Sequence, residues 1–171
     1  MIKLGARAGL RAGEILGLSP ADIDKGRSRL HIQRSVWEGK LGPPKNGKAR
    51  WQPVPRDVIE ALDRVKVVGR ERFFLRDDGT PATIETLRSW VYTAEKRAGL
   101  HDEAKHGQIH RLRHTYASHL VMRGVTLAVV QSLMDHANIQ TTMRYAHLAP
   151  REIDRAVAVL AEAQPGARSA G

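Results

Sequence analysis

The stretch that most limits how this chain can fold runs from His110 to Tyr145, HRLRHTYASHLVMRGVTLAVVQSLMDHANIQTTMRY. Its apolar residues keep helical spacing after His110 until Gly124 interrupts the pattern. The spacing predicts a helix that begins at His110 and ends at Gly124, a second helix over 127–134 and a third over 139–145. This part of the chain is therefore expected to be helical throughout.

The polar residues of this stretch indicate phosphate chemistry. His110 and Arg113 are three apart, so on a helix they share one face and are expected to point at the same place. A proton-carrying donor beside a guanidinium fork is a suitable phosphate-binding pair. Tyr145 precedes an Ala-Pro break and is expected to project from the end of an element. A phosphate clamp with a hydroxyl nearby suggests attack on phosphorus.

Composition narrows the choice of partner. The 171 residues suit one domain, and 28 Lys and Arg against 18 Asp and Glu give a net charge of +10. That surplus favours a polyanion, above all nucleic acid, over a membrane surface. No apolar run approaches the roughly 20 residues of a membrane-spanning helix, and the N-terminus has no signal-peptide core. The sequence has no cysteine, which excludes disulfides, thiol nucleophiles and Cys-ligated zinc, so we expect a cytoplasmic protein.

Two segments of the first half predict a small antiparallel sheet. Residues 29–37 alternate between apolar and polar, and 51–55 are typical of a returning strand after a turn rich in Gly, Pro and Asn. The tip of the hairpin is expected to carry Lys45, Lys48 and Arg50. This tip is either a solvated basic loop or a contact to the DNA backbone.

The remaining segments have the apolar spacing of helices. They are residues 4–18, 56–67, 83–98 and 150–163. Within the first of them, Arg11 and Glu14 are three apart, which by itself indicates a surface ion pair. We expect an α+β fold that is mainly helical with a small antiparallel β-sheet, followed by a disordered tail at 164–171.

Three segments resemble the motifs of the tyrosine recombinase (phage integrase) family. They are AGLRAGEILGLSPADID, PPKNGKARWQPVP, and HRLRHTYASHLVMRGVTLAVVQSLMDHANIQTTMRYAHL. They occur in that family's order and extend the resemblance over almost the whole chain, to about residue 150. The resemblance implies a catalytic domain over residues 1–163 with that family's fold. It also implies a domain truncated at its N-terminus, without the family's separate N-terminal DNA-clamping domain.

The resemblance implies a catalytic set, matched position by position. The set is Arg11, Lys45, His110, Arg113, His136 and Tyr145. Tyr145 matches the nucleophile and Lys45 the general acid, with Lys48 as its rival, while Glu14 matches an acidic position that supports the first arginine. Contacts to DNA are expected from four basic residues: Lys45, Lys48, Arg50 and Arg111.

The chemistry implied is breaking and rejoining of DNA through a 3′-phosphotyrosyl intermediate. The phenol of Tyr145 loses its proton as it attacks, while Arg11 and Arg113 hold the non-bridging oxygens. The intermediate conserves the bond energy, so no metal, ATP or other cofactor is expected. The family also implies a homotetramer on DNA that forms through the C-terminal helix. Integration, excision and resolution remain equally open as outcomes.

Several alternatives stay open at this point. His106, His110 and His114 recur every four residues, a spacing that suits zinc on one helix, although no acidic ligand accompanies them. His114 is otherwise interpreted as a packing or capping residue. Asp135 stands where the family usually has Gly, so its carboxylate is expected to bond His136, to repel phosphate, or to change the backbone. A non-catalytic DNA-binding or partner-binding remnant and a metal-dependent nuclease are the competing functions.

Overall fold

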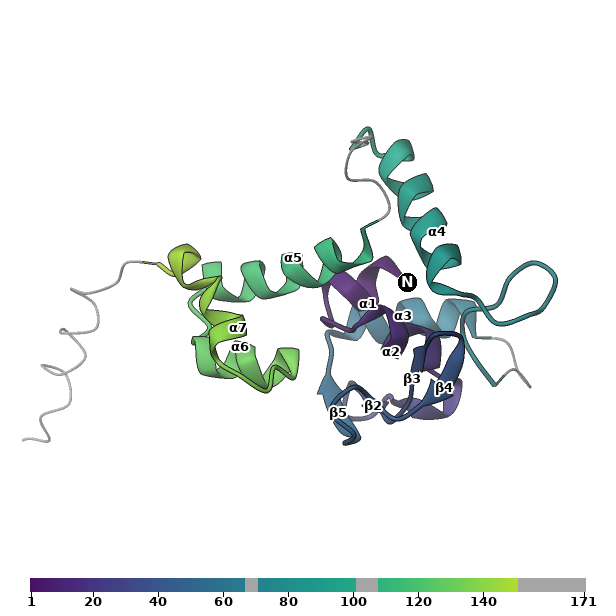
Figure 1. Ribbon diagram of the computed structural model, residues 1–171, viewed down its shortest axis with the longest axis horizontal. Helices are drawn as coiled ribbons and strands as arrows, with labels where there is room; N and C mark the ends of the chain where they lie inside the picture. The colour runs from purple at the N-terminus through teal and green to yellow at the C-terminus, as the bar shows by residue number, and fades with distance from the viewer. Residues whose placement is uncertain (67–70, 101–107, 151–171) are drawn as a thin grey trace, which may run out of the picture.

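A computed structural model of the chain describes residues 1–66, 71–100 and 108–150. Most of the chain before residue 100 forms one part, which we call the N-terminal body (Figure 1). Helix α5 (Ile109–Met122) leaves this body and carries a smaller helical part at its far end, which we call the C-terminal unit. Each part has its own hydrophobic core.

The N-terminal segment forms two short helices where the spacing predicted one. Helix α1 (Ile2–Ala6) ends before Gly9, and α2 (Ala12–Gly17) begins after it. Gly9 has φ +66, and a Cβ built on it would lie 2.4 Å from Cδ1 of Tyr116 on α5. The prediction of a continuous helix was wrong because a contact with α5 requires a glycine turn at this position.

The strands divide into two sheets. Strands β1 (Ile23–Asp24), β2 (Arg29–Ile32) and β5 (Arg50–Pro53) form an antiparallel sheet in the order β1-β2-β5. Strands β3 (Ser35–Trp37) and β4 (Lys40–Gly42) pair with each other separately. The strand predicted over 29–37 is therefore broken in two, whereas the small antiparallel sheet is confirmed. The 3₁₀ turn η1 (Pro20–Asp22) leads into β1.

One face of the three-stranded sheet is buried and the other is exposed. Leu30 and Ile32 enter the core, whereas His31 stacks on Trp51 across the β2–β5 pair, with 4.6 Å between ring centroids. The Arg29 guanidinium lies over the Trp51 ring at 4.1 Å from its centroid. The exposed face thus carries a stack of His31, Trp51 and Arg29, joined by ring stacking and a cation–π contact.

Two longer helices complete the body. Helices α3 (Arg56–Val65) and α4 (Ile84–Arg97) lie within the segments predicted for them. The Thr83 hydroxyl accepts a hydrogen bond from the Thr86 N–H and caps α4, and Gly99 follows that helix at φ +67. Trp90 packs against Phe74 at the edge of the core. The body core is large, and its members are Leu4, Ala8, Leu10, Ile15, Leu16, Leu18, Leu30, Ile32, Val36, Val54, Val58, Ile59, Leu62, Phe73, Phe74, Ala82, Leu87, Val91 and Ile109.

The C-terminal unit consists of the second half of α5 and three short elements. These are α6 (Leu127–Met134), α7 (Gln140–Met143) and the 3₁₀ turn η2 (Ala146–Leu148). Gly124 at φ +81 ends α5 as predicted, while α7 is shorter than the helix expected over 139–145. The core of this unit has six members, Tyr116, Ala117, Val121, Val130, Met134 and Tyr145.

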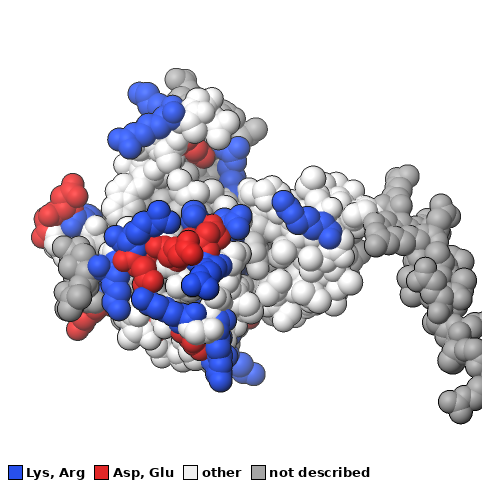
Figure 2. All heavy atoms as spheres, turned by 180° about the vertical axis from the view of Figure 1, so that it is seen from behind, with Lys and Arg blue, Asp and Glu red and all other residues white. Residues whose placement is uncertain are grey.

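The surface charge is unevenly divided between the two parts. Seen from behind, basic and acidic side chains gather over the body, whereas the C-terminal unit is largely free of charge on that face (Figure 2). The predicted mainly helical α+β class is confirmed. None of the helices among the described residues is long and apolar enough to cross a membrane. The helix expected over 150–163 and the tail at 164–171 lie outside the described residues.

Candidate active site

A cluster of charged side chains lies where the two hydrophobic cores meet, and we call it the polar seam. Its members are Arg11, Glu14, Arg50, Arg113 and Asp135. The first three come from α2 and β5 of the body, whereas Arg113 comes from α5 and Asp135 follows α6. The seam therefore exists only when the body and the C-terminal unit are in contact.

Arg113 joins the two parts directly. Its side chain is buried, and its guanidinium donates to the carbonyl oxygen of Gly9 in the body and to that of Met134 in the C-terminal unit. Burial, followed by the charge of Arg11, lowers its pKa to about 10, so it remains protonated at neutral pH. His110, three residues earlier on the same helix, is exposed, whereas Arg113 is buried, and the charge of Arg113 acts on the pKa of His110.

Glu14 is the acidic centre of the body's side of the seam. Arg50 donates to its two carboxylate oxygens at 2.8 and 3.1 Å, and Arg11 donates to Oε1 at 3.1 Å. The ion pair suggested by the spacing of Arg11 and Glu14 is present, but it is not on the surface, because only 1% of Glu14 is exposed. Burial alone would raise the pKa of Glu14, but the hydrogen bonds and charges of Arg50 and Arg11 together outweigh it, and the pKa is lowered.

Arg50 does not lie at the hairpin tip where the sequence placed it. It is the first residue of β5, and its side chain is 16% exposed and faces Glu14. The alternation along β5 carries the signal, because Arg50 and buried Gln52 share one side while Trp51 and Pro53 are exposed on the other. Arg50 is thus a buried partner of Glu14, and a DNA contact no longer follows from its position.

Asp135 closes the seam from the C-terminal unit. It adopts a left-handed backbone conformation, φ 50 and ψ 48, at the end of α6. Its Oδ2 accepts from Arg11 at 2.9 Å, and its backbone oxygen accepts from Arg11 at 2.7 Å. The second bond uses the other terminal nitrogen of the same guanidinium. Three effects of Asp135 were considered: a bond to His136, repulsion of phosphate and a changed backbone. The backbone keeps the left-handed conformation usual for glycine, and the carboxylate is bonded to Arg11.

His136 follows the seam and is held by hydroxyl and amide groups. Its Nδ1 lies 3.0 Å from Oγ1 of Thr142, and its carbonyl oxygen accepts from the Gln131 amide at 3.1 Å. Burial, then the charges of Arg113 and Arg11, lower its pKa to about 4. At neutral pH the ring is therefore neutral, and it is placed to donate a hydrogen bond rather than a proton.

Tyr145 lies behind the seam, within the core of the C-terminal unit. The residue is 5% exposed, and its hydroxyl lies 2.5 Å from Nδ1 of His114 on α5. Burial raises the pKa of the phenol. The interpretation of His114 as a packing or capping residue missed this contact, although its position one helical turn after His110 places it on the same side of α5.

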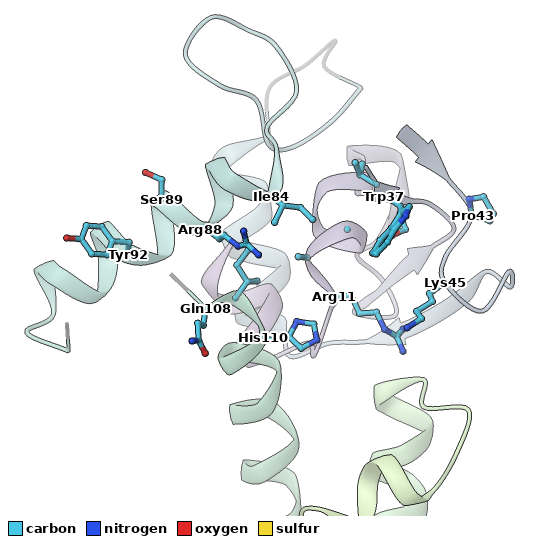
Figure 3. A pocket seen from close by; sticks show the side chains of 15 residues that line it. Arg11, Trp37, Pro43, Lys45, Ile84, Arg88, Ser89, Tyr92, Gln108 and His110 are labelled. Atoms are coloured by element: carbon cyan, nitrogen blue, oxygen red, sulfur yellow. The ribbon is translucent and has the colours of Figure 1, made fainter. Parts of the chain in front are cut away.

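A pocket of about 1490 Å³ opens beside the seam. Arg11, Lys45 and His110 line one part of it, where their side chains extend into the same region of the view (Figure 3). Partial loss of solvent, followed by the charge of Arg113, lowers the pKa of His110. Residues of α4 form the opposite wall, among them Arg88. The structure thus brings three of the six predicted catalytic residues to one pocket.

The other predicted residues lie around this pocket rather than on its surface. Lys48 is exposed on the loop between β4 and β5 and is absent from the pocket lining, unlike Lys45. The Arg111 side chain lies 3.8 Å from the carboxylate of Glu95. Across residues 1–66, 71–100 and 108–150, no three His, Asp or Glu side chains form a group able to hold a metal ion, and His106 lies outside these ranges.

Comparisons with known proteins identify the family of this chain. The family model described as "Phage integrase family" matches residues 1–152. A "Tyrosine recombinase" of Thermosipho africanus is 32% identical over 146 residues, which cover 85% of this chain and 47% of that protein. The chain therefore spans about half the length of the curated relatives it matches.

Solved structures share the fold. The Tn1549 transposon integrase in complex with a circular intermediate DNA superposes with a TM-score of 0.73 at 22% identity, covering 94% of this chain and 57% of that one. The catalytic domain of bacteriophage HP1 integrase gives a TM-score of 0.67 at 24% identity, covering 97% of this chain and 83% of that one. At this level of identity the likeness concerns the fold alone.

Proposed function

This chain belongs to the phage integrase family of tyrosine recombinases, and on that premise we propose that its polar seam and the adjoining pocket break and rejoin DNA strands. The observation that carries the proposal is that Arg11 and Arg113 both donate to the carbonyl oxygen of Met134, a residue of the same small core as Tyr145. Two guanidinium groups and a phenol are the groups that strand transfer to a tyrosine requires.

Tyr145 is the nucleophile in this proposal. Its hydroxyl oxygen attacks the scissile phosphorus, the bond to the 5′ oxygen breaks, and a 3′-phosphotyrosyl bond forms. Negative charge grows on the non-bridging oxygens during attack. Arg11 and Arg113 stabilise that charge with fixed donors, as an oxyanion hole does. The reaction exchanges one phosphodiester for another, so the chemistry runs in reverse when a 5′ hydroxyl attacks the adduct.

Lys45 supplies the proton for the departing 5′ oxygen. It is exposed on the loop that joins β4 to β5, and it lines the same pocket as Arg11 and His110. Lys48 lies on the same loop but outside the pocket lining, which favours Lys45 as the acid. His110, whose pKa is lowered and whose ring faces the pocket, assists as a neutral hydrogen-bonding group.

The substrate of this proposal is double-stranded DNA. The net charge of +10 favours a polyanion, and one of the structurally similar integrases was solved in complex with DNA. A recombinase that acts on chromosomal DNA associates with the nucleoid. A homotetramer formed through the helix expected over 150–163 belongs to the same proposal, and that helix lies outside the described residues.

The test is covalent capture of DNA on a nicked suicide substrate in the presence of EDTA. The parental chain should form an adduct, and Tyr145→Phe should form none while still binding duplex DNA. An adduct that persists in Tyr145→Phe would move the nucleophile elsewhere. Duplex binding without an adduct by the parental chain would indicate a non-catalytic remnant, and cleavage that stops on addition of EDTA would indicate a nuclease.

A further inference from the structure

The resemblance assigns no catalytic role to His114, yet this residue makes a close polar contact with the proposed nucleophile. Its Nδ1 lies 2.5 Å from the Tyr145 hydroxyl, and the two rings are 5.9 Å apart between centroids. The residues are 31 positions apart in sequence and meet because α5 packs against η2. A ring nitrogen at this distance from a buried phenol is the natural acceptor of its hydrogen bond.

We propose that His114 accepts the proton of Tyr145 as the phenol attacks phosphorus, which makes it a further catalytic residue of this site. The inference rests on the proposed function, since it needs Tyr145 to be the nucleophile. The other histidines of the site are engaged elsewhere: Nδ1 of His136 faces the Thr142 hydroxyl, and His110 lies on the pocket wall. Of the three, His114 is the one whose ring nitrogen is bonded to the reacting oxygen.

The surroundings of His114 keep its ring neutral at rest. Burial comes first, and the charges of Arg144, His110 and Arg113 add to it, so the pKa of His114 is lowered. His136 also faces this group, because the charge of His114 acts on its pKa. A neutral imidazole with an unprotonated Nδ1 accepts the phenolic hydrogen bond, and this requires the proton to lie on Nε2.

The proton moves during attack, not before it. The pKa of Tyr145 is raised by burial while that of His114 is lowered, so transfer in the resting protein is unfavourable. As the bond from the Tyr145 oxygen to phosphorus forms, the O–H bond breaks and Nδ1 takes the proton. The bond from phosphorus to the 5′ oxygen breaks, and that oxygen takes a proton from Lys45. In the joining reaction His114 returns its proton to the departing phenol.

The hydrogen bond is tested without DNA. In nitrogen-15 NMR of the free protein, Nδ1 of His114 should have the chemical shift of an unprotonated nitrogen, and this shift should change in Tyr145→Phe. Protonated Nδ1 in the parental protein, or a shift insensitive to Tyr145→Phe, would overturn the contact. This readout is independent of catalysis, so it separates the inference from the proposed function.

Proton transfer is tested by single-turnover adduct formation. His114→Ala should slow cleavage by about a hundredfold or more, the usual contribution of a general base, and added imidazole should restore part of the rate. His114→Asn places an amide oxygen near the Nδ1 position and keeps the hydrogen bond without accepting the proton, so it should remain slow. His119→Ala, an exposed histidine on the same helix, should match the parental rate.

The outcomes separate three roles for His114. A parental rate in His114→Ala overturns the proposal, and a parental rate in His114→Asn reduces His114 to a positioning residue and overturns proton transfer. Loss of activity in His114→Ala without rescue, accompanied by a lowered melting temperature, would indicate a structural role and count against it. If the parental chain forms no adduct, the proposed function fails and proton transfer fails with it, whereas the NMR result still decides the contact.

Discussion

The N-terminal body and the C-terminal unit contribute different kinds of group to the candidate site. The body provides a large core and charges held in place by ion pairs, namely Arg11, Glu14 and Arg50. The C-terminal unit has six core residues, and from residue 114 to 150 its charged side chains are Arg123, Asp135 and Arg144. What this unit contributes instead is hydrogen-bonded neutral groups, namely His114, His136 and Tyr145.

This difference suggests that the body is the rigid part of the site and that the C-terminal unit is the part that moves. One of the six core residues of the C-terminal unit is Tyr145, so the proposed nucleophile is also one of the residues that pack this core. A small core opens at lower free energy than a large one, and reactive segments are commonly drawn from such regions. We therefore expect the body to set the position of the phosphate and the C-terminal unit to bring the nucleophile to it.

The largest effect should come from cutting the connection between the two parts. Arg113→Met keeps a long side chain but removes the donors to the carbonyl oxygens of Gly9 and Met134. Leaving these two buried acceptors without a charged donor should lower the free energy of unfolding by about 3–5 kcal/mol. Urea denaturation followed by circular dichroism measures the loss, and hydrogen exchange should show it mainly in residues 114–148.

Arg123→Met is the matched control. Arg123 lies at the end of the same helix, is exposed, and donates to the carbonyl oxygen of His119. Its removal should change stability by less than about 0.5 kcal/mol. If exchange in Arg113→Met rises equally in the body and in the C-terminal unit, the two parts unfold as one and the comparison fails.

A smaller effect should come from neutralising the one acid that the C-terminal unit presents to the body. Asp135→Asn tolerates the left-handed backbone and releases the Arg11 guanidinium from a carboxylate at 2.9 Å. Phosphate should then compete better for Arg11. Removing one such charge contact is worth on the order of 1 kcal/mol, so affinity for duplex DNA should rise about fivefold.

The gain depends on Arg11, and this supplies the control. In the Arg11→Met background, Asp135→Asn should leave DNA affinity nearly unchanged, as measured by fluorescence anisotropy at fixed salt. Asp57→Asn, which removes a surface carboxylate paired with Lys3 and Arg7, gives the effect of one charge lost elsewhere on the body. An equal gain in all three variants would mean that Asp135 acts only through net charge.

The smallest effect is a dependence of stability on pH. The pKa values of His110, His114 and His136 are all lowered from the ordinary 6.5, that of His136 to about 4. The unfolded chain therefore binds more protons than the folded protein below pH 6.5. Stability is fully present above that pH and declines as pH falls toward about 4. Glu14, whose pKa is lowered, begins to matter only below its ordinary 4.5.

Thermal unfolding between about pH 7 and pH 5 isolates the histidines. The melting temperature should fall by a few degrees across this range in the parental chain, and by less in His136→Gln, because the neutral amide does not titrate. Hydrogen exchange at pH 5 should rise first in the C-terminal unit, which holds His114 and His136. A melting temperature independent of pH would show that these rings are solvated in the folded protein.

Several helices could be predicted from the sequence because the spacing of apolar residues within each segment determines them. Helices α3, α4 and α6 follow from apolar periodicity, and Gly124 ends α5 where predicted. The break at Gly9 was missed because its cause is a ring on another helix, Tyr116. No periodicity within residues 4–18 reports that contact.

The sequence predicted which residues belong to the candidate site, but it did not predict how they are arranged. The motifs identified Arg11, Lys45 and His110 as catalytic candidates, and the structure gathers these three at one pocket. The inward position of Arg50 depends on which face of β5 meets the core, and the contact between His114 and Tyr145 depends on two segments 31 residues apart. Tertiary packing decides both, so neither is available from local sequence.

The distribution of aromatic residues gives the two parts different optical properties. All three tryptophans, Trp37, Trp51 and Trp90, belong to the body, while Tyr116 and Tyr145 lie in the core of the C-terminal unit. Tryptophan fluorescence therefore reports on the body alone. Opening of the C-terminal unit by itself should leave this fluorescence unchanged. A tryptophan introduced at exposed Val129 on α6 would give the smaller part a signal of its own.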